Sequence, residues 1–582
     1  WREPLNAPNG LYAVSVFDGT ELNVFKKEPA SHNVSLDFRK AIYSRQTGFE
    51  NAVVESERFA ARDDFYLLCQ KYSVTAKKDG FLEIIIGVDG DVWDINGPHY
   101  DAVELVEEDC AIGVKAVSHE KKTLVCVCSR SVPRFECERS VIKKDRGIFE
   151  KFSVAAKAGK TYTVERMSSV AASTDRADCF AFSMEKVKNA DYDSVKENHT
   201  ESWERAWQNA QATIEGDDEA MLALNYSMYH LMSIAPRHSS SLSIPARGLS
   251  GQTYTGAVFW DTEMFMLVLF LYTDPSVAKT ILKYRIDTLP GAMEKARSYG
   301  YDGAFYAWES QEGGYDACSD YNVTDVFTGR PMRTYFRDKQ IHISAAVVYA
   351  LVKYTRVTGD RSLIEEGGNK VIIECARFYL DRMMSRIGSD KYELRDVIGP
   401  DEYHERVDNN GYTNRMAKFT LETAASLSET DPELKARFLD AAAKLYIPAP
   451  DENGVIEQFD GYFELEDASL DQVRSRLLHE KEYWGGAYGV ASGTRIIKQA
   501  DVVARLGMFP DDFDEDIMKI NWEYYEPRTE HGSSLSSCMY AELACYFGQP
   551  DRAYRFFINS ALADLRGGGK EWAGLIYIGG TH

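Results

Sequence analysis

The periodicity of this 582-residue chain changes near Asp191, and that change constrains the fold more than any other feature. Between about Phe65 and Val170, short runs rich in β-branched and aromatic residues are separated by Gly, Asp and Lys-Lys turns. The clearest runs are F-Y-L-L-C-Q-K-Y-S-V-T-A, G-F-L-E-I-I-I-G-V, T-L-V-C-V-C, F-E-K-F-S-V-A-A and K-T-Y-T-V-E-R. Runs of this length and spacing predict an antiparallel β-sandwich. We assign residues 1–188 to this domain and expect it to be incomplete at its N-terminus.

Beyond Asp191 the apolar residues recur at helical spacing. Residues 189–217 carry charges and aromatic residues in such a pattern, and we interpret them as a helical linker. The remaining segment, 218–582, contains roughly ten apolar helical patterns, at 218–235, 262–272, 276–299, 341–357, 362–384, 414–428, 432–445, 496–508, 534–547 and 550–565. Paired helices in this number, joined by several long loops, favour a toroid of helical hairpins whose loops carry function. The predicted fold class is therefore multidomain, with a β-sandwich followed by a helical domain.

One stretch of the helical domain is rich in chemistry. The run V-I-G-P-D-E-Y-H-E-R-V-D-N-N-G-Y-T-N, residues 397–414, places Asp401, Glu402 and further carboxylates among Gly, Pro and Asn residues that bend the backbone. A solvated acidic turn explains this composition equally well. The functional interpretation is a carboxyl group on a loop, where Tyr403 and Pro400 desolvate it enough to keep its proton near neutral pH.

Two other loops combine aromatic residues with carboxylates, namely I-P-A-R-G-L-S-G-Q-T-Y-T-G-A-V-F-W-D-T-E and G-A-F-Y-A-W-E-S-Q-E-G-G-Y-D. Their candidate residues are Arg247, Trp260, Asp261, Trp308 and Glu309. A sugar site needs a flat apolar face for the C–H side of the ring and a carboxylate for paired hydroxyls. The structural alternatives are a helix N-cap at Asp261 and a lid over the core at Trp308.

Two more segments precede apolar helical patterns. In A-S-G-T-R-I-I-K-Q-A-D-V-V, Lys498 and Gln499 taken alone are typical of a solvated helix face. In T-E-H-G-S-S-L-S-S, residues 532–534 come directly before a helix, and their serines taken alone indicate a helix cap. A helix N-terminus also offers free N–H groups and a positive dipole to an anion, and His531 adds a donor. Hydroxyl and N–H groups of this kind suit inorganic phosphate.

In chain order, the motifs F-W-D-T-E, W-E-S, G-P-D-E-Y-H, K-Q-A-D and H-G-S-S-L-S resemble those of glycoside hydrolase family 65. This family contains the inverting phosphorylases of alpha-linked glucose disaccharides, and the resemblance covers most of the chain. It implies that residues 218–582 form an (α/α)6 barrel behind the β-sandwich and that Glu402 is the general acid. The predicted substrate-binding residues are Trp260, Asp261, Arg247, Trp308, Glu309, Lys498 and Gln499. The predicted phosphate-binding residues are His531, Gly532, Ser533, Ser534 and His582.

These assignments predict an inverting glycoside phosphorylase. Glu402 protonates the bridging oxygen while phosphate attacks from the opposite face, which yields β-glucose 1-phosphate and a free sugar. In the resembled family H-G-S-S-L-S is the phosphorylase signature, whereas the trehalose hydrolases differ there. The stretches Y-Y-E-P-R-T-E-H-G-S-S-L-S and A-C-S-D-Y-N-V-T-D are most similar to the nigerose or kojibiose type. The insert at 320–331 falls where acceptor selectivity would be set.

Two alternatives stay open. An inverting alpha-glucoside hydrolase of the same fold needs a second carboxylate to activate water, and Glu530, Glu405 and Glu309 are the candidates. A non-catalytic carbohydrate-binding protein would bind glycans through its β domain. That function would leave the acidic loop and the anion-binding helix start without a purpose.

The composition limits the classes of partner that this chain can bind. A net charge of -23 argues against nucleic acid or an anionic membrane surface, and no apolar run is long enough to span a bilayer. We find no G-x-G-x-x-G after a strand, no G-K-[ST] loop and no ligand cluster of metal spacing, so we expect no metal and no cofactor, with phosphate as a co-substrate. The ten scattered cysteines indicate reduced thiols and a cytoplasmic location. The resemblance implies a homodimer.

Overall fold

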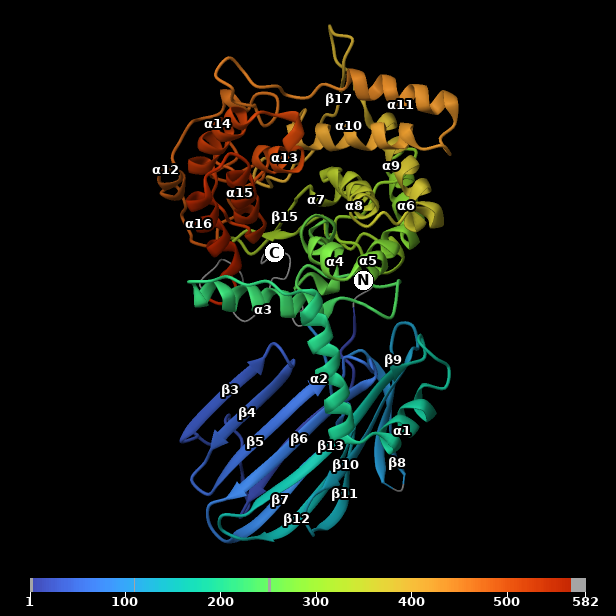
Figure 1. Cartoon of the computed structure of the whole chain (residues 1–582), viewed down its shortest axis with the longest axis vertical. Coiled ribbons are helices and arrows are strands. Elements are labelled where there is room, and N and C mark those ends of the chain that lie inside the picture. Colours follow the sequence, from blue (N-terminus) through green and yellow to red (C-terminus); the bar gives the residue numbers. More distant parts are fainter. Residues whose placement is uncertain (1–3, 109, 250–252, 567–582) are drawn as a thin grey trace. The chain divides into compact units, whose positions relative to one another are not determined.

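The computed structural model describes residues 4–108, 110–249 and 253–566. They form two compact units, one comprising residues 5–212 and the other comprising Pro4 and residues 213–566. The division falls inside the 189–217 segment. Figure 1 shows strands in the first unit and helices in the second, the order that the periodicity predicts.

The first unit is an antiparallel β-sandwich of two sheets. The strands of the five-stranded sheet, in spatial order, are β11 (Glu138–Lys144), β12 (Gly147–Ala156), β7 (Gly80–Asp89), β1 (Asn9–Phe17) and β2 (Thr20–Glu21). Those of the eight-stranded sheet are β3 (Ser31–Asp37), β4 (Ile42–Gly48), β5 (Ala52–Ala60), β6 (Leu67–Ala76), β13 (Thr161–Ala172), β10 (Leu124–Pro133), β9 (Ala111–Ser118) and β8 (Tyr100–Glu108). The predicted sandwich is confirmed.

The sandwich core follows from the two-residue period of the strands. In β7 the buried side chains Leu82, Ile84 and Ile86 alternate along the strand, as one face of a pleated sheet requires. They belong to one apolar cluster with Tyr72 and Val164 of the other sheet. Burial of these two inner faces is what holds the sheets together.

Two helices complete this unit. Helix α1 (Cys179–Asn189) packs on β10 and β13, where Cys179 Sγ lies 3.3 Å from Cys126 Sγ. Helix α2 (Tyr192–Asn209) begins after Asp191, whose side chain accepts a hydrogen bond from Ser194 N. The side chain of Trp207 donates to Phe38 O at 2.9 Å. The helix predicted as a linker is therefore attached to the sandwich.

The second unit is helical. Its α-helices are α3 (Asp218–Ile234), α4 (Leu267–Thr273), α5 (Pro275–Asp287), α6 (Leu289–Ser298), α7 (Phe336–Lys339), α8 (His342–Thr358), α9 (Asn369–Arg382), α10 (Gly411–Ser426), α11 (Pro432–Lys444), α12 (Leu470–Arg474), α13 (Val502–Met508), α14 (Glu515–Tyr525), α15 (Ser534–Tyr546) and α16 (Pro550–Ala561). Two short hairpins, β14 (Val323–Thr324) with β15 (Pro331–Met332) and β16 (Met384–Ser385) with β17 (Tyr392–Glu393), lie in its loops.

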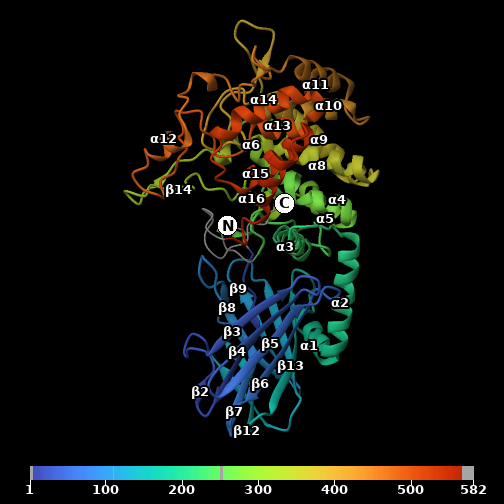
Figure 2. The same ribbon diagram turned by 60° about the vertical axis from the view of Figure 1, so that its left-hand side comes forward.

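These helices are arranged in pairs around a ring. Contacts run from α4 to α8, α10, α13 and α15 in turn. Helices α11 and α16 each pack on one member of that series, and α5, α9 and α14 each pack on two. Figures 1 and 2 show α10 and α11 as one such pair, and α4 and α5 as another. Helix α8 is buried on most sides, as expected of an inner helix. The predicted barrel of paired helices is confirmed.

Three helical predictions differ from the structure in detail. The single pattern at 276–299 is divided into α5 and α6 at Thr288, next to Pro290, which cannot donate a backbone hydrogen bond. The pattern at 496–508 becomes helical only at Val502, because the residues before it form a loop. Helix α14 was not predicted, although Asp514 caps it by accepting a hydrogen bond from Ile517 N.

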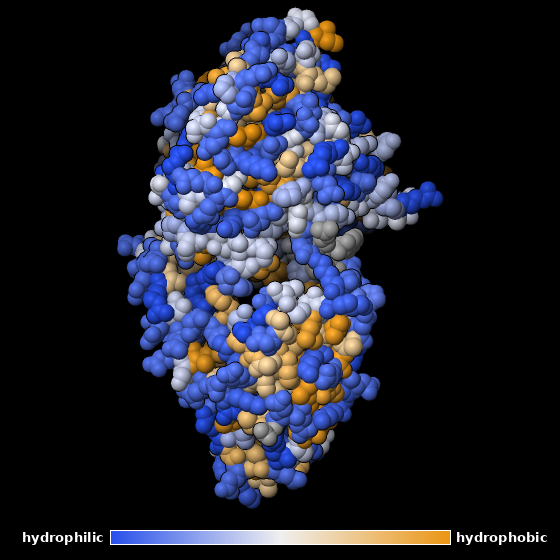
Figure 3. All heavy atoms as spheres, turned by 90° about the vertical axis from the view of Figure 1, so that its right-hand side faces the viewer, coloured by the Kyte–Doolittle hydropathy of each residue, from blue (hydrophilic) through white to orange (hydrophobic). Residues whose placement is uncertain are grey.

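The face of the molecule shown in Figure 3 is mainly polar. Hydrophilic residues predominate there, and hydrophobic residues occur between them in scattered groups. A search of the described helices finds none with the length and apolarity that a membrane crossing needs. The same part of the chain holds no cluster of three His, Cys, Asp or Glu side chains suited to a metal ion.

Candidate active site

Glu402 lies on a loop between β17 and α10 that is closed at its base. Val397 and Val407 exchange two backbone hydrogen bonds of 2.9 Å, and the side chain of Asn410 caps α10 by accepting from Thr413 N. We call residues 397–410 the acid loop. Its Gly, Asp and Asn residues thus form a fixed hairpin, not the solvated turn that composition alone allows.

A buried carboxylate next to Glu402 organises this loop. Asp401 Oδ1 accepts from Lys498 N at 2.9 Å and from Tyr403 N at 3.1 Å. Its Oδ2 accepts from Gln458 Nε2 at 3.0 Å and contacts His404 Nδ1 at 2.5 Å. Four contacts fully satisfy a carboxylate that is almost completely buried. Asp401 therefore fixes the backbone on both sides of Glu402.

His404 is the charged partner of Asp401. Its Nδ1 faces the Asp401 carboxylate and its Nε2 lies 2.8 Å from Thr494 O, so both ring nitrogens face acceptors. Burial disfavours the charged ring, but the attraction and hydrogen bond of Asp401 raise the pKa of His404 above its ordinary value. The ring is then an imidazolium that donates twice, which ties the acid loop to Thr494.

Asp501 joins the K-Q-A-D segment to the same loop. Its carboxylate accepts from Asn410 Nδ2 at 3.0 and 3.1 Å and from Asp401 N at 3.3 Å. Burial and the neighbouring charge of Asp401 raise the pKa of Asp501 to about 7. It makes no side-chain cap to α13. The last residue of K-Q-A-D thus binds the acid loop and not its own helix.

Lys498 and Gln499 both turn toward the acid loop. Lys498 Nζ lies 2.6 Å from Glu402 Oε2, and the Gln499 side chain donates to Pro400 O. The structure therefore brings together the predicted acid and these two predicted sugar contacts. Neither side chain is on a solvated helix face.

The F-W-D-T-E segment enters the site through an irregular helix. Trp260 and Asp261 are buried and precede a π-helical turn, Thr262–Met266, a feature frequent at functional sites. Asp261 does not cap this turn. The turn is fixed from behind by Glu263, whose two oxygens accept from Arg285 at 2.7 and 2.8 Å with both side chains fully buried.

The W-E-S segment is fixed in a similar way. Asp316 accepts from the backbone N–H groups of Trp308 and Glu309, each at 3.2 Å, and pairs with buried Lys295 at 2.7 Å. Burial and the Asp316 charge raise the pKa of Glu309 to about 7. Asp316 therefore orients Glu309 and also favours its protonated form.

One histidine links the two tryptophan loops. The His342 ring lies 4.8 Å from that of Trp260, 6.4 Å from that of Trp308 and 5.5 Å from that of Tyr412, the second residue of α10. Its Nε2 lies 2.6 Å from Gln340 Oε1, and burial lowers the pKa of His342 to about 3. A neutral, buried His342 thus holds both predicted aromatic contacts against the helix that follows the acid loop.

Arg247 is the predicted sugar contact at the start of the first loop. It is buried, and its guanidinium carbon lies 5.4 Å from the centre of the Tyr254 ring. Tyr254 adopts a positive φ of 65°, which is rare for a bulky residue. Backbone strain of this kind occurs where the surrounding structure holds a functional loop in place.

The segment from Glu530 to Ser536, which we call the serine loop, adjoins the acid loop. Gly532 N donates to Lys498 O at 3.1 Å, and Tyr403 donates its hydroxyl to Glu530 Oε2 at 3.1 Å. A Cβ atom on Gly532 would lie 2.1 Å from that Glu530 oxygen, so glycine fits there best. Ser533 is the N-cap of α15 and accepts from Leu535 N.

Two polar atoms of the serine loop stand out. His531 Nε2 and Ser534 Oγ are buried, and neither has a hydrogen-bond partner among the described residues. Burial and the positive charge of Arg555 lower the pKa of His531 to about 4, so the ring is neutral at pH 7. Unpaired buried polar atoms are rare because each costs about 1–3 kcal/mol. His582, the other predicted phosphate contact, lies outside the described residues.

The carboxylates considered as hydrolytic bases are in different surroundings. Glu405 Oε2 accepts from Tyr335 N at 3.0 Å and its Oε1 from the Tyr483 hydroxyl at 3.3 Å, while burial raises its pKa to about 7. Both oxygens are therefore engaged. Glu530 accepts from Tyr403, and Glu309 is held by the loop of Asp316.

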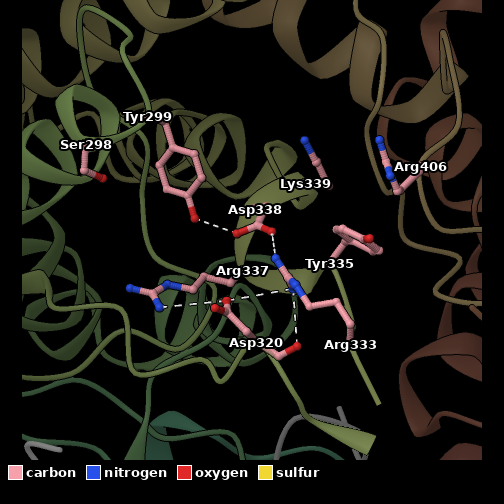
Figure 4. A pocket seen from close by; sticks show the side chains of 9 residues that line it. All are labelled: Ser298, Tyr299, Asp320, Arg333, Tyr335, Arg337, Asp338, Lys339 and Arg406. Carbon is pink, nitrogen blue, oxygen red and sulfur yellow. Dashed lines mark hydrogen bonds and ion pairs between the residues drawn. The ribbon is translucent and has the colours of Figure 1, made fainter.

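A cavity of about 450 Å³ lies beside the predicted acceptor loop. Its lining residues are Ser298, Tyr299, Asp320, Arg333, Tyr335, Arg337, Asp338, Lys339 and Arg406. Figure 4 shows Asp338 between Tyr299 and Arg333, with an interaction drawn to each. All four cationic side chains form ion pairs, with Asp320, Asp338 or Asp396. The charges are thus paired within the protein, and none of the predicted site residues lines this cavity.

Sequence reasoning missed the residues that fix the candidate site residues in place through hydrogen bonds, ion pairs and ring contacts. They are Asp401, His404, Arg285, Lys295, Asp316, His342 and Asp501 in its role toward the acid loop. Asp401 and His404 carried a signal, since they flank the acid within one motif. The partners Arg285 and Lys295 carried none, because each lies more than 20 residues from the carboxylate it binds, on a helix of ordinary amphipathic pattern.

The fold and the motifs match one family. Two models of glycosyl hydrolase family 65 match this chain, that of the N-terminal domain at residues 2–206 and that of the central catalytic domain at residues 225–579. The chain therefore belongs to glycosyl hydrolase family 65, as the motifs predict.

Individual relatives agree with this assignment. The chain is 52% identical to a nigerose phosphorylase of Lachnoclostridium phytofermentans, over 100% of this chain and 84% of the relative. It is 36% identical to a 1,2-alpha-glucosylglycerol phosphorylase of Bacillus selenitireducens, over 100% of this chain and 79% of the relative. A solved structure described as "Putative kojibiose phosphorylase from human microbiome" superposes with a TM-score of 0.87 at 21% identity, over 100% of this chain and 78% of that one. That likeness supports the fold alone.

Proposed function

We propose that this family 65 enzyme cleaves nigerose with inorganic phosphate, with inversion, to give β-glucose 1-phosphate and glucose. The enzyme class is a disaccharide phosphorylase, a glycosyltransferase-type activity, as the relatives of this family indicate. Nigerose is the substrate named for the relative that is 52% identical over the whole chain. Kojibiose, the other predicted substrate, is named for relatives that are 31–32% identical over the whole chain.

The observation that carries phosphorolysis is a pair of buried serine-loop atoms that have no hydrogen-bond partner among the described residues. His531 Nε2 and Ser534 Oγ are buried at the N-terminus of the 13-residue helix α15, where free N–H groups and the helix dipole favour an anion. A phosphate oxygen accepts hydrogen bonds from both. We infer that phosphate occupies this position, with the Ser533 hydroxyl as a further donor. Gly532, whose N–H donates to Lys498 O, lines the same position and leaves room for the anion because it has no side chain.

The proposed chemistry needs one protein acid. The phosphate oxygen forms a bond to the anomeric carbon while the bond to the bridging oxygen breaks on the opposite face. Glu402 gives its proton to that oxygen, which leaves as a hydroxyl of the acceptor glucose. Phosphate is already an anionic nucleophile, so no second carboxylate is required, and the protein contributes positioning and hydrogen-bond donors.

Lys498 links sugar binding to this acid. Its ammonium forms a 2.6 Å ion pair with the Glu402 carboxylate. A general acid must present its carboxyl group to the leaving oxygen, so the pair with Lys498 must separate before Glu402 can act. In the proposed function, the hydroxyls of the bound glucose accept hydrogen bonds from Lys498 and Gln499. The other residues that line this sugar are Trp260, Asp261, Arg247, Trp308 and Glu309.

The test is a product assay on maltose, trehalose, kojibiose and nigerose, each with and without inorganic phosphate. The expected result is β-glucose 1-phosphate from nigerose only when phosphate is present. Release of glucose without phosphate would support the hydrolase and make Glu530 the first candidate base. Sugar binding without any product would support a binding protein.

Further parts of the proposal concern the whole molecule. We propose a homodimer in the cytoplasm, with a β-sandwich domain at 1–188, a helical segment at 189–217 and a catalytic barrel at 218–582. All ten cysteines are free thiols, which supports a reducing compartment. Light scattering on the purified chain, at twice the 65.7 kDa monomer mass if the dimer forms, tests the oligomeric state.

A further inference from the structure

The hydroxyl of Ser536 lies between the sugar-side and phosphate-side segments of the site. Ser536 is fully buried in the first turn of α15. Its Oγ accepts a hydrogen bond from Ala500 N at 3.1 Å and lies 2.9 Å from His531 Nδ1. Ala500 follows Lys498 and Gln499 directly, so one oxygen atom contacts both segments.

The direction of the second hydrogen bond follows from counting protons. Ala500 N–H can only donate, so it uses one lone pair of Ser536 Oγ. The hydroxyl has a single hydrogen, and His531 Nδ1 is the one acceptor within reach in the part of the chain that the structure describes. If Nδ1 carried a proton, two hydrogens would face each other or the buried hydroxyl hydrogen would have no acceptor. Nδ1 is therefore the bare nitrogen that accepts from Ser536.

A bare Nδ1 fixes the opposite side of the ring. Burial and Arg555 lower the pKa of His531 to about 4, so at pH 7 the imidazole holds one proton, which must then be on Nε2. That atom is the buried one without a partner among the described residues. His531 also adopts a positive φ of 53°, a conformation uncommon outside glycine. Strain held in place by the surrounding structure is typical of functional positions.

We propose that Ser536 is a positioning residue that fixes His531 as the Nε2–H tautomer, so that this N–H donates to the phosphate nucleophile. The inference rests on the proposed function. A neutral imidazole has one donor and one acceptor, and the wrong tautomer would turn a lone pair toward an anion. The same hydroxyl also accepts a hydrogen bond from Ala500 N. The tautomer of His531 is therefore coupled to the position of the segment that carries Lys498.

Two substitutions of His531 test which of its ring nitrogens donates to phosphate. In His531→Gln the side-chain amide reaches the position of Nε2, whereas in His531→Asn it reaches that of Nδ1. We expect the KM for phosphate to rise less than about tenfold in H531Q and about 100-fold in H531N, because a hydrogen bond to a charged group contributes about 1.5–3 kcal/mol. An H531N enzyme that binds phosphate as well as H531Q would overturn the proposal.

Ser536→Ala tests the positioning role itself. We expect the KM for phosphate to rise about tenfold, more than the KM for the disaccharide does, because the ring can then adopt either tautomer. Ser537→Ala is the matched control, since it removes the next buried hydroxyl of α15, which makes no hydrogen bond to His531 among the described contacts. If S536A lowers the melting temperature without changing the KM for phosphate, Ser536 has only a structural role and the proposal fails.

Nitrogen-15 spectra of the histidine side chains read the tautomer directly. The expected wild-type spectrum, with His531 assigned by its loss in H531Q, shows a protonated Nε2 and an unprotonated Nδ1. A protonated Nδ1 would overturn the proposal even if S536A does not fold. If the wild-type enzyme shows no phosphate-dependent turnover, both the proposed function and this inference are wrong. If turnover depends on phosphate but His531 is protonated at Nδ1, only this inference is wrong.

Discussion

The acid loop and the serine loop differ in how far their buried polar atoms are hydrogen-bonded. In the acid loop, Asp401 receives four hydrogen-bonding contacts and both nitrogens of His404 face acceptors. In the serine loop, His531 Nε2 and Ser534 Oγ are buried without a partner in the described chain. The two loops are neighbours, joined by the hydrogen bond from Tyr403 to Glu530.

The contrast separates positioning from binding. A saturated network leaves its members no capacity for a ligand, so the acid loop can only hold Glu402 in place. An unsatisfied buried donor costs about 1–3 kcal/mol until a partner arrives. These unpartnered atoms are where we propose that phosphate binds, and substitutions in the two loops should therefore have different consequences.

The largest expected effect is on the acid itself. Glu402→Gln should lower kcat on nigerose about 10³-fold, because general acid catalysis contributes about 10²–10⁴-fold. Turnover of alpha-glucosyl fluoride should change little, since fluoride leaves without a proton. Product assays on both substrates measure the difference, with melting temperature as the check on folding.

Glu405→Gln is the matched control within the same loop. We expect less than a tenfold loss, because Glu405 accepts from Tyr335 N and Tyr483 and an amide oxygen can keep one of these bonds. If E405Q loses more activity on nigerose than E402Q, the acid has been assigned to the wrong carboxyl group.

Much of this architecture could be predicted from local patterns. The strands follow from two-residue alternation, as at Ile84 and Ile86, and most helices from apolar spacing. The acid loop could be located because Gly, Pro and Asn bend the chain around carboxylates. Glu402 could be chosen from that motif, although its ion pair with Lys498 joins residues 96 positions apart and required the fold.

The supporting pairs could not be predicted, because their partners come from distant elements. Arg285 looks like any arginine of an amphipathic helix until α5 packs against the turn that carries Glu263. His404 is charged only because Thr494 O and Asp401 converge on its two nitrogens. Neither fact is present in the order of the residues, since both depend on loops that meet only in the barrel.

A second prediction tests whether the acid loop is held by its buried charge pair. Asp401→Asn should lower the free energy of unfolding by about 3 kcal/mol, because removing one partner leaves the buried His404 ring without its counter-charge. Chemical denaturation measures the change. Asp467→Asn is the control, since Asp467 pairs with Arg528 at the surface and such pairs contribute about 1 kcal/mol or less. Equal losses in both variants would contradict the conclusion that the Asp401–His404 pair stabilises the acid loop.

A third prediction compares two adjacent serines. Ser534→Ala should leave the free energy of unfolding within about 0.5 kcal/mol of wild type, since Ser534 Oγ makes no hydrogen bond to any described residue. It should nevertheless raise the KM for phosphate about tenfold. Ser533→Ala should cost about 1 kcal/mol of stability, because Ser533 caps α15. If S534A is the less stable variant and binds phosphate normally, the serine loop is an ordinary helix start.

The last prediction concerns a pH dependence that His531 adds to stability. Its pKa is about 4 in the folded chain and about 6.5 when unfolded, so below pH 6.5 the unfolded state binds a proton that the folded state does not. His531 therefore costs stability as the pH falls from 6.5 to 4, with a limiting slope of about 1.4 kcal/mol per pH unit. His404 has the opposite sign: its raised pKa contributes stability that is present below pH 6.5 and lost as the pH rises through its folded pKa. Between pH 7 and 5, the free energy of unfolding of wild type minus that of H531Q should therefore decrease as the pH falls. A difference that stays constant with pH would mean that His531 titrates normally, and the serine loop would then present an ordinary histidine to its ligand.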